Sequence, residues 1–242
     1  MGATRELLLP LTLLGCFVIY YLADQPFWVV LACAIPMLGV YAVAPAWAAR
    51  SVARFDRDAV TILARSHVAA LRKRYARALG MRLFAPPAVR AERKAMVLAE
   101  CGETRAARAA YREALDEHAG RAPLRVMLGY AHASFSLGDD AQAISMYRKL
   151  LATAAGLPGV ERNLAHALVR RGQDLDEALQ MLGRAEREPG DAVRQNELKL
   201  LRAIAYAKLG DQARAKELLR ETDESLEQTA ALRDELRSLL DP

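Results

Sequence analysis

The stretch that decides the fold is GETRAA at residues 102–107, and a similar hexapeptide, GDDAQA, follows at residues 138–143. Gly172 and Gly210 begin two further copies of this pattern. The four glycines are separated by 36, 34 and 38 residues. A repeat of this length indicates stacked helix–turn–helix units. We expect each glycine to end the first helix of its unit in a left-handed turn.

The second helix of each unit carries a small residue and, four positions later, a large one. The small residues are Ala107, Ala143, Ala178 and Ala215, and the large ones are Tyr111, Tyr147, Leu182 and Leu219. The first helices carry their small residues at Ala95, Ala131, Ala165 and Ala203. Small residues let two helices cross closely and large residues fill the space between them, so the pattern predicts tightly packed helix pairs.

This pattern resembles the tetratricopeptide repeat, a helix–turn–helix unit of 34 residues. The resemblance covers about two-thirds of the chain. It implies an all-α fold with a solenoid of four repeats at residues 88–222, followed by a capping helix at 223–242. Two departures are the missing Leu-Gly pair in the first helices and a closing proline that is clear only at Pro189.

The N-terminal residues 1–49 predict a transmembrane helical hairpin. Residues 7–23 and 27–49 carry no charge, and Asp24 lies in the turn between them. A membrane-spanning helix needs about 20 apolar residues. Arg5 precedes the first segment, and Arg50 and further arginines follow the second. The positive-inside rule therefore places both termini and the repeat domain in the cytoplasm, at what we expect to be a bacterial inner membrane.

A lipid anchor is the alternative to the hairpin. Residues 13–16, LLGC, resemble a lipoprotein cleavage site that ends in Cys16. The residues after Cys16 stay apolar, FVIYY at 17–21, whereas a lipoprotein is expected to continue with a polar tether. This alternative would make the chain a periplasmic envelope-assembly factor.

Residues 50–87 form a basic helical connector, with nine Lys or Arg and two acids. Its pattern Tyr75-x-x-Ala78-Leu79 lies 36 residues before the equivalent pattern that starts at Tyr111, which suggests a degenerate repeat. A membrane-surface helix is the other reading. In that reading, basic residues close to the apolar segment contact anionic lipid headgroups. The candidates are Arg50, Arg54 and Arg57.

The sequence contains no motif of an enzyme. No nucleophile elbow, phosphate-binding loop or dinucleotide fingerprint occurs, and the four histidines lack partners at zinc-binding spacing. We therefore expect no catalysis, cofactor, metal or small-molecule substrate. Residues 88–242 carry 24 Lys or Arg and 25 acids. This balance argues against a nucleic-acid partner, because such domains present a basic surface.

By the resemblance, His132 and His166 occupy the same first-helix position in adjacent repeats, one that faces the concave groove. The other groove positions are Arg125, Leu128, Phe135, Arg162 and Arg170. Arginines with aromatic residues suit an acidic or C-terminal peptide, although both histidines could equally be ordinary helix-surface residues. The expected function is a membrane-anchored adaptor that presents this groove to a cytoplasmic protein. A structural or assembly subunit of a larger membrane complex remains the alternative.

Overall fold

The computed structural model describes residues 15, 27–154, 157, 159–187 and 189–240, and within these residues every regular element is a helix. The fold is therefore all-α, as predicted. The chain divides into two compact units between Gly129 and Tyr130. The division falls inside one helix, α7 (Leu124–Ser136). The two units are described separately below.

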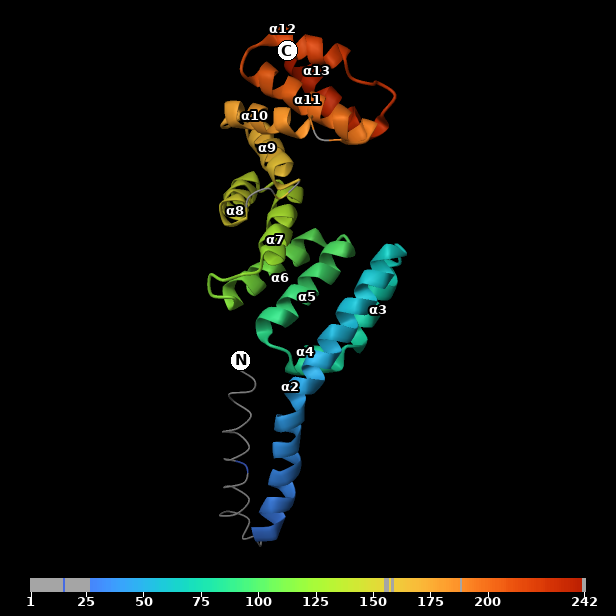
Figure 1. Ribbon diagram of the computed structural model, residues 1–242, viewed down its shortest axis with the longest axis vertical. Helices are drawn as coiled ribbons and strands as arrows, with labels where there is room; N and C mark the ends of the chain where they lie inside the picture. The colour runs from blue at the N-terminus through green and yellow to red at the C-terminus, as the bar shows by residue number, and fades with distance from the viewer. Residues whose placement is uncertain (1–14, 16–26, 155–156, 158, 188, 241–242) are drawn as a thin grey trace. The chain divides into compact units, whose positions relative to one another are not determined.

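The first unit begins with a long helix, α2 (Phe27–Ala64), which passes through Ala49 without a break. The short helices α3 (Val68–Arg77) and α4 (Leu79–Phe84) follow it, and both lie against α2 (Figure 1). Phe55, Leu71 and Met81 are fully buried and form the centre of this core. The connector residues 50–87 thus fold back on α2 around an apolar core of their own.

The remaining helices form successive antiparallel pairs. The pair α5 (Pro87–Glu100) and α6 (Thr104–Glu117) completes the first unit together with the start of α7. The second unit continues with four helices: α8 (Asp140–Thr153), α9 (Val160–Arg171), α10 (Leu175–Ala185) and α11 (Ala192–Lys208). It ends with α12 (Gln212–Arg220), a short 3₁₀ turn η1 (Glu227–Thr229) and α13 (Ala230–Leu240).

The turns between paired helices confirm the role predicted for the four glycines. Gly102, Gly138, Gly172 and Gly210 have φ between +69° and +86°, a region that favours glycine because it has no Cβ. Polar residues after two of these glycines then cap the second helix. The carboxylates of Asp139 and Asp211 accept hydrogen bonds from the N–H groups of Gln142 and Arg214, at 3.4 and 3.1 Å.

The small residues of the repeat pattern lie in the core. All eight alanines predicted for the two helices are fully buried: Ala95, Ala107, Ala131, Ala143, Ala165, Ala178, Ala203 and Ala215. Tyr147 and Leu182 are also fully buried and fill the space beside them. The burial expected of these positions is therefore observed.

The first predicted membrane segment, residues 7–23, lies outside the described residues. Among those described, no helix combines the length and apolar character that crossing a membrane requires. The predicted membrane-spanning hairpin of residues 1–49 is therefore without support from the structure.

Candidate functional site

The predicted groove residues are divided between the two units. Arg125 and Leu128 belong to the first unit. The other five, His132, Phe135, Arg162, His166 and Arg170, belong to the second, on helices α7 and α9. The candidate site is the face that these five residues share, and we call it the α7–α9 face.

Two pairs of side chains connect α7 to α9. Asn163 Nδ2 lies 2.9 Å from His132 Nε2, a hydrogen-bonding distance. One turn further along α7, the rings of Phe135 and His166 meet edge to face, with centroids 5.0 Å apart. Each histidine therefore contacts a side chain of the neighbouring first helix.

Arg170 is held by the protein itself. Its Nε donates to the two carboxylate oxygens of Asp140 at 2.9 and 2.8 Å, and its Nη2 donates to the carbonyl of Phe135 at 2.7 Å. The guanidinium also covers the Phe135 ring at 4.2 Å from the centroid. These contacts position the Phe135 ring and leave Arg170 little capacity to bind a further carboxylate.

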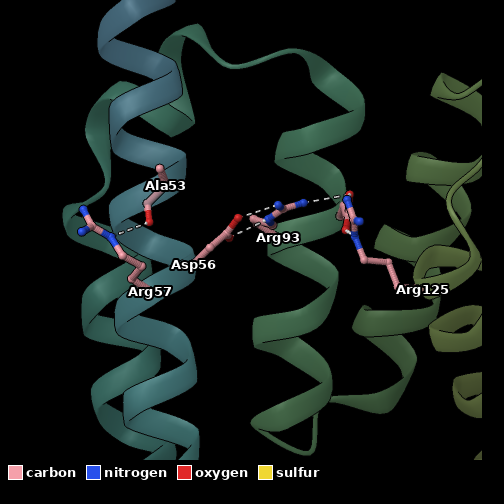
Figure 2. A network of polar contacts seen from close by, with 6 residues as sticks. Ala53, Asp56, Arg57, Arg93 and Arg125 are labelled. Atoms are coloured by element: carbon pink, nitrogen blue, oxygen red, sulfur yellow. Dashed lines mark hydrogen bonds and ion pairs between the residues drawn. The ribbon is translucent and has the colours of Figure 1, made fainter.

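Arg125 is also engaged within its own unit. Its Nε and Nη2 both donate to the carboxylate of Glu92 on α5, whose side chain is only 7% exposed. Arg93, next to Glu92, makes a two-point contact with Asp56 on α2 at 2.9 and 2.7 Å. Figure 2 shows this chain of charges running from α2 through α5 to Arg125. Arg125 therefore links neighbouring helices.

Arg162 differs from these two arginines, because it makes no hydrogen bond or ion pair with any of the described residues. Its positive charge nevertheless acts on both histidines, because it lowers the pKa of each ring. Arg162 is thus the cation of the α7–α9 face that is available to a partner.

Both histidines have a pKa below its ordinary value. Burial, helped by Arg170 and Arg162 and opposed by Glu235 and Asp140, lowers the pKa of His166 to about 4. Burial and Arg162 also lower the pKa of His132. At neutral pH the two rings can therefore donate or accept hydrogen bonds but carry no charge. Within the described residues, no group of His, Cys, Asp and Glu is arranged to hold a metal ion.

Three residues that shape this face do not follow from the sequence pattern. Asn163 holds His132, Asp140 holds Arg170, and the buried ring of Tyr147 lies 5.9 Å from His132. The repeat pattern gives Tyr147 only a packing role. The spacing offers one signal, because Asn163 follows His132 by 31 residues and Arg170 follows Asp140 by 30, close to one repeat in each case.

The predicted membrane-surface arginines, Arg50, Arg54 and Arg57, are all exposed on α2. Arg57 donates from Nε to the carbonyl of Ala53 at 3.4 Å (Figure 2). Before Arg50, α2 exposes a series of apolar side chains: Ile35, Leu38, Val40, Val43 and Trp47.

Comparison with known proteins identifies the fold. No protein-family model and no curated protein matches the chain. Among solved structures, a tetratricopeptide repeat protein from Parabacteroides merdae is similar at 14% identity and a TM-score of 0.57, over 79% of this chain and 74% of the other.

Two further structures resemble nearly the whole chain. PilF of Pseudomonas aeruginosa has 18% identity and a TM-score of 0.52, over 97% of this chain and 96% of its own. PilW, described as a widely conserved type IV pilus biogenesis factor, has 16% identity and a TM-score of 0.52, over 99% of this chain and 100% of its own. The protein therefore has the tetratricopeptide-repeat fold. This fold is that of a repeat scaffold, in which stacked helices present extended concave surfaces.

Proposed function

We propose that this protein is a non-catalytic scaffold that binds a protein partner at the α7–α9 face. The observation that carries the proposal is the contrast among the arginines. Arg125 and Arg170 have carboxylate partners within the protein, whereas Arg162 has none among the described residues and lies beside two neutral histidines. A single available guanidinium among fixed aromatic rings suits one carboxylate with an apolar neighbour.

The best-fitting partner is an acidic or C-terminal segment of another protein. Arginine binds carboxylates through two parallel hydrogen bonds, which add geometric specificity to the charge. The exposed edge of His132 can add a hydrogen bond, and Phe135 is already held in place by Arg170. Phe135 and His132 are already held by contacts within the protein. Binding a partner would therefore cost little conformational entropy at these two side chains.

The proposal includes attachment to a membrane, which rests on the sequence and on the exposed apolar face of α2. Residues 7–23 and 27–49 are uncharged. Ile35 and Val43 are each 62% exposed, which is costly for large apolar side chains in water. In this proposal the repeats and both termini lie on the cytoplasmic side, where the arginines after the apolar segment are retained.

An assembly role is the second candidate, and the near-complete coverage of PilF and PilW favours it. PilW is described as a type IV pilus biogenesis factor, so the same arrangement of repeats occurs in a protein of envelope assembly. A lipid anchor on Cys16 would place this chain outside the cytoplasm. Labelling with a palmitate analogue decides this point, because a protein without label on Cys16 is not a lipoprotein.

A crosslinking affinity purification from intact membranes tests the main proposal. The bait is the full chain with a C-terminal tag, compared with Arg162→Glu. Arg171→Glu is the matched control, because it makes the same charge change at an exposed position of the same helix. We expect one partner that is lost with Arg162→Glu and retained with Arg171→Glu.

Two results would contradict this proposal. Equal recovery of the partner with all three baits would exclude the α7–α9 face as its binding site. Recovery of integral membrane proteins alone, unaffected by either change, would favour a subunit of a membrane complex. Exchange of residues 1–49 for an unrelated hairpin would then remove those proteins.

A further inference from the structure

Helix α4 folds back beside the end of the apolar part of α2. The rings of Trp47 and Phe84 pack with centroids 5.5 Å apart, although 37 residues separate them. Gly80 is equally close, since a Cβ at this position would lie 3.1 Å from the Trp47 ring and from Ser51 Cβ. The fold therefore places α4 beside residues 47–51 of α2. Figure 1 shows α4 lying against α2.

This short helix has one buried and one exposed apolar side. Gly80 and Met81 are buried against α2, whereas Leu79 and Leu83 are 53% and 54% exposed. Trp47, which packs against Phe84 of the same helix α4, is 47% exposed. Two leucines and a tryptophan thus form an exposed apolar patch directly after the apolar run of α2.

The surroundings of this patch carry positive charge without compensating acids. The only acids in residues 50–87 are Asp56 and Asp58, and they pair with Arg93 and Arg74. Arg50, Arg54 and Arg82 are exposed and have no carboxylate partner among the described residues. Arg82 uses one N–H on the carbonyl of Ala76 at 3.2 Å, so its other donors remain available.

The distance of each arginine from Trp47 along the axis of α2 decides whether it can contact the same lipid surface as the patch. Arg50 and Arg54 lie about 4.5 and 10 Å beyond Trp47, and Arg57 about 15 Å, at 1.5 Å per residue. Charges attract a lipid surface only within a Debye length of about 8 Å at physiological salt. Arg82 follows Gly80 by two residues on α4, and Gly80 lies against Trp47. Arg72 and Arg74, in contrast, pair with Glu103 and Asp58.

We infer that Trp47, Leu79 and Leu83, with Arg50 and Arg82, form a collar that docks on an anionic lipid surface. This inference rests on the membrane attachment proposed above and adds a second contact, from α4. Tryptophan and arginine both favour the boundary between headgroups and acyl chains, where apolar parts insert and charges face the phosphates. Two contacts on separate helices would fix the orientation of the first unit on the membrane.

The charges favour lipid over a second copy of the chain. Two copies that met through this patch would bring their uncompensated arginines together, and like charges in contact oppose association. Anionic headgroups complement the same arginines at about 1 kcal/mol each, which corresponds to roughly fivefold in the docking equilibrium constant. Before Trp47, α2 exposes further large apolar side chains, among them Val40 and Val43.

The test uses the full chain, with its three cysteines replaced, reconstituted in vesicles of phosphatidylglycerol and phosphatidylethanolamine. A nitrobenzoxadiazole label is attached at Leu83→Cys. The control label is attached at Val60→Cys, an apolar residue of α2 that is 71% exposed and lies about 20 Å beyond Trp47. Circular dichroism verifies that both labelled proteins fold.

We expect lipids brominated near the headgroup to quench the label at residue 83 and to leave the label at residue 60 unchanged. Arg82→Gln should lower the docked fraction, about fivefold in its equilibrium constant, and phosphatidylcholine vesicles should lower it further. Vesicle flotation is measured in parallel. If the chain does not float with the vesicles, both the proposed membrane attachment and the proposed collar are wrong.

A chain that floats while residue 83 stays unquenched overturns the collar alone. Equal quenching at residues 60 and 83 would also overturn it, because α2 would then lie flat on the membrane. A blue shift at residue 83 without bromine quenching would show that protein, not lipid, covers the patch.

Discussion

The ring of Tyr111 lies so close to Gly129 that a Cβ on this glycine would be 2.2 Å from Tyr111 Cζ. Tyr111 is 8% exposed and Gly129 lies in α7, so the contact joins α6 to the start of α7 within the first unit. Gly129 has an ordinary helical backbone conformation, so its φ angle does not require glycine. Glycine is required because a side chain at this position would collide with the Tyr111 ring.

Gly129→Ala should therefore lower the free energy of unfolding by about 1–3 kcal/mol, because the added methyl displaces a buried ring. Gly183→Ala is the matched control: it also lies in a helix, and a Cβ there would meet no packed atom within 4 Å. That change should stabilise the protein by about 0.5–1 kcal/mol. Urea denaturation measures both, and equal effects at the two sites would refute the close contact.

The charged network between α2, α5 and α7 should matter more for stability than exposed ion pairs. Arg93 is 13% exposed and Glu92 7%. Arg93→Gln leaves the buried Glu92 carboxylate with Arg125 alone, and we expect a loss of about 1–3 kcal/mol. Arg72→Gln removes an ion pair whose partners are 69% and 39% exposed, and should cost less than about 1 kcal/mol. Urea denaturation midpoints of the two variants test this order, and a larger loss for Arg72→Gln would contradict it.

His166 should make stability depend on pH. Burial lowers its pKa to about 4 in the folded protein, against about 6.5 for the unfolded chain. Between these values the unfolded state binds more protons, so the stability present above pH 6.5 is lost as the pH falls toward 4. The loss approaches about 3 kcal/mol at most. Charged groups around the ring are Arg162, Arg170, Asp140, Glu197 and Glu235.

His166→Leu should flatten this dependence in urea denaturation at pH 7.5 and pH 5. His67→Gln, at an exposed position outside the second unit, serves as the control and should leave the slope unchanged. A slope that persists in His166→Leu would assign the effect to other groups.

Asn196 should hold the C-terminal segment on α11. Its buried side chain donates to Thr229 Oγ1 at 2.8 Å and to the carbonyl of Asp223 at 3.3 Å, and it accepts from the Asp223 N–H at 2.8 Å. Asn196→Ala leaves these groups without their hydrogen-bond partner and should lower the free energy of unfolding by about 1–3 kcal/mol. We expect faster hydrogen exchange in residues 223–240.

Gln212→Ala is the control for this measurement. It removes one exposed hydrogen bond of 3.4 Å to the carbonyl of Leu239 and should change exchange in α13 only slightly. Unaltered exchange in Asn196→Ala would show that apolar contacts alone, such as that of the fully buried Leu236, hold α13 in place.

The site shows where prediction from the sequence stops. The repeat pattern predicts His132 and His166 on one face of adjacent helices, because periodicity decides which side of each helix a residue occupies. The partners of the arginines are not predictable in this way. Arg125 pairs with Glu92 and Arg170 with Asp140, 33 and 30 residues away. Such pairs depend on how neighbouring helices rotate and approach, and periodicity along one helix does not specify this.

By itself, the sequence determined the all-α repeat fold, since glycines with positive φ and buried alanines follow from local backbone and packing requirements. Only the tertiary structure decided which charges are already paired and that α4 lies beside Trp47. The physical reason is distance, because local propensity acts over a few residues. The contacts of Arg93 with Asp56 and of Trp47 with Phe84 each join residues 37 positions apart, through close packing of separate helices.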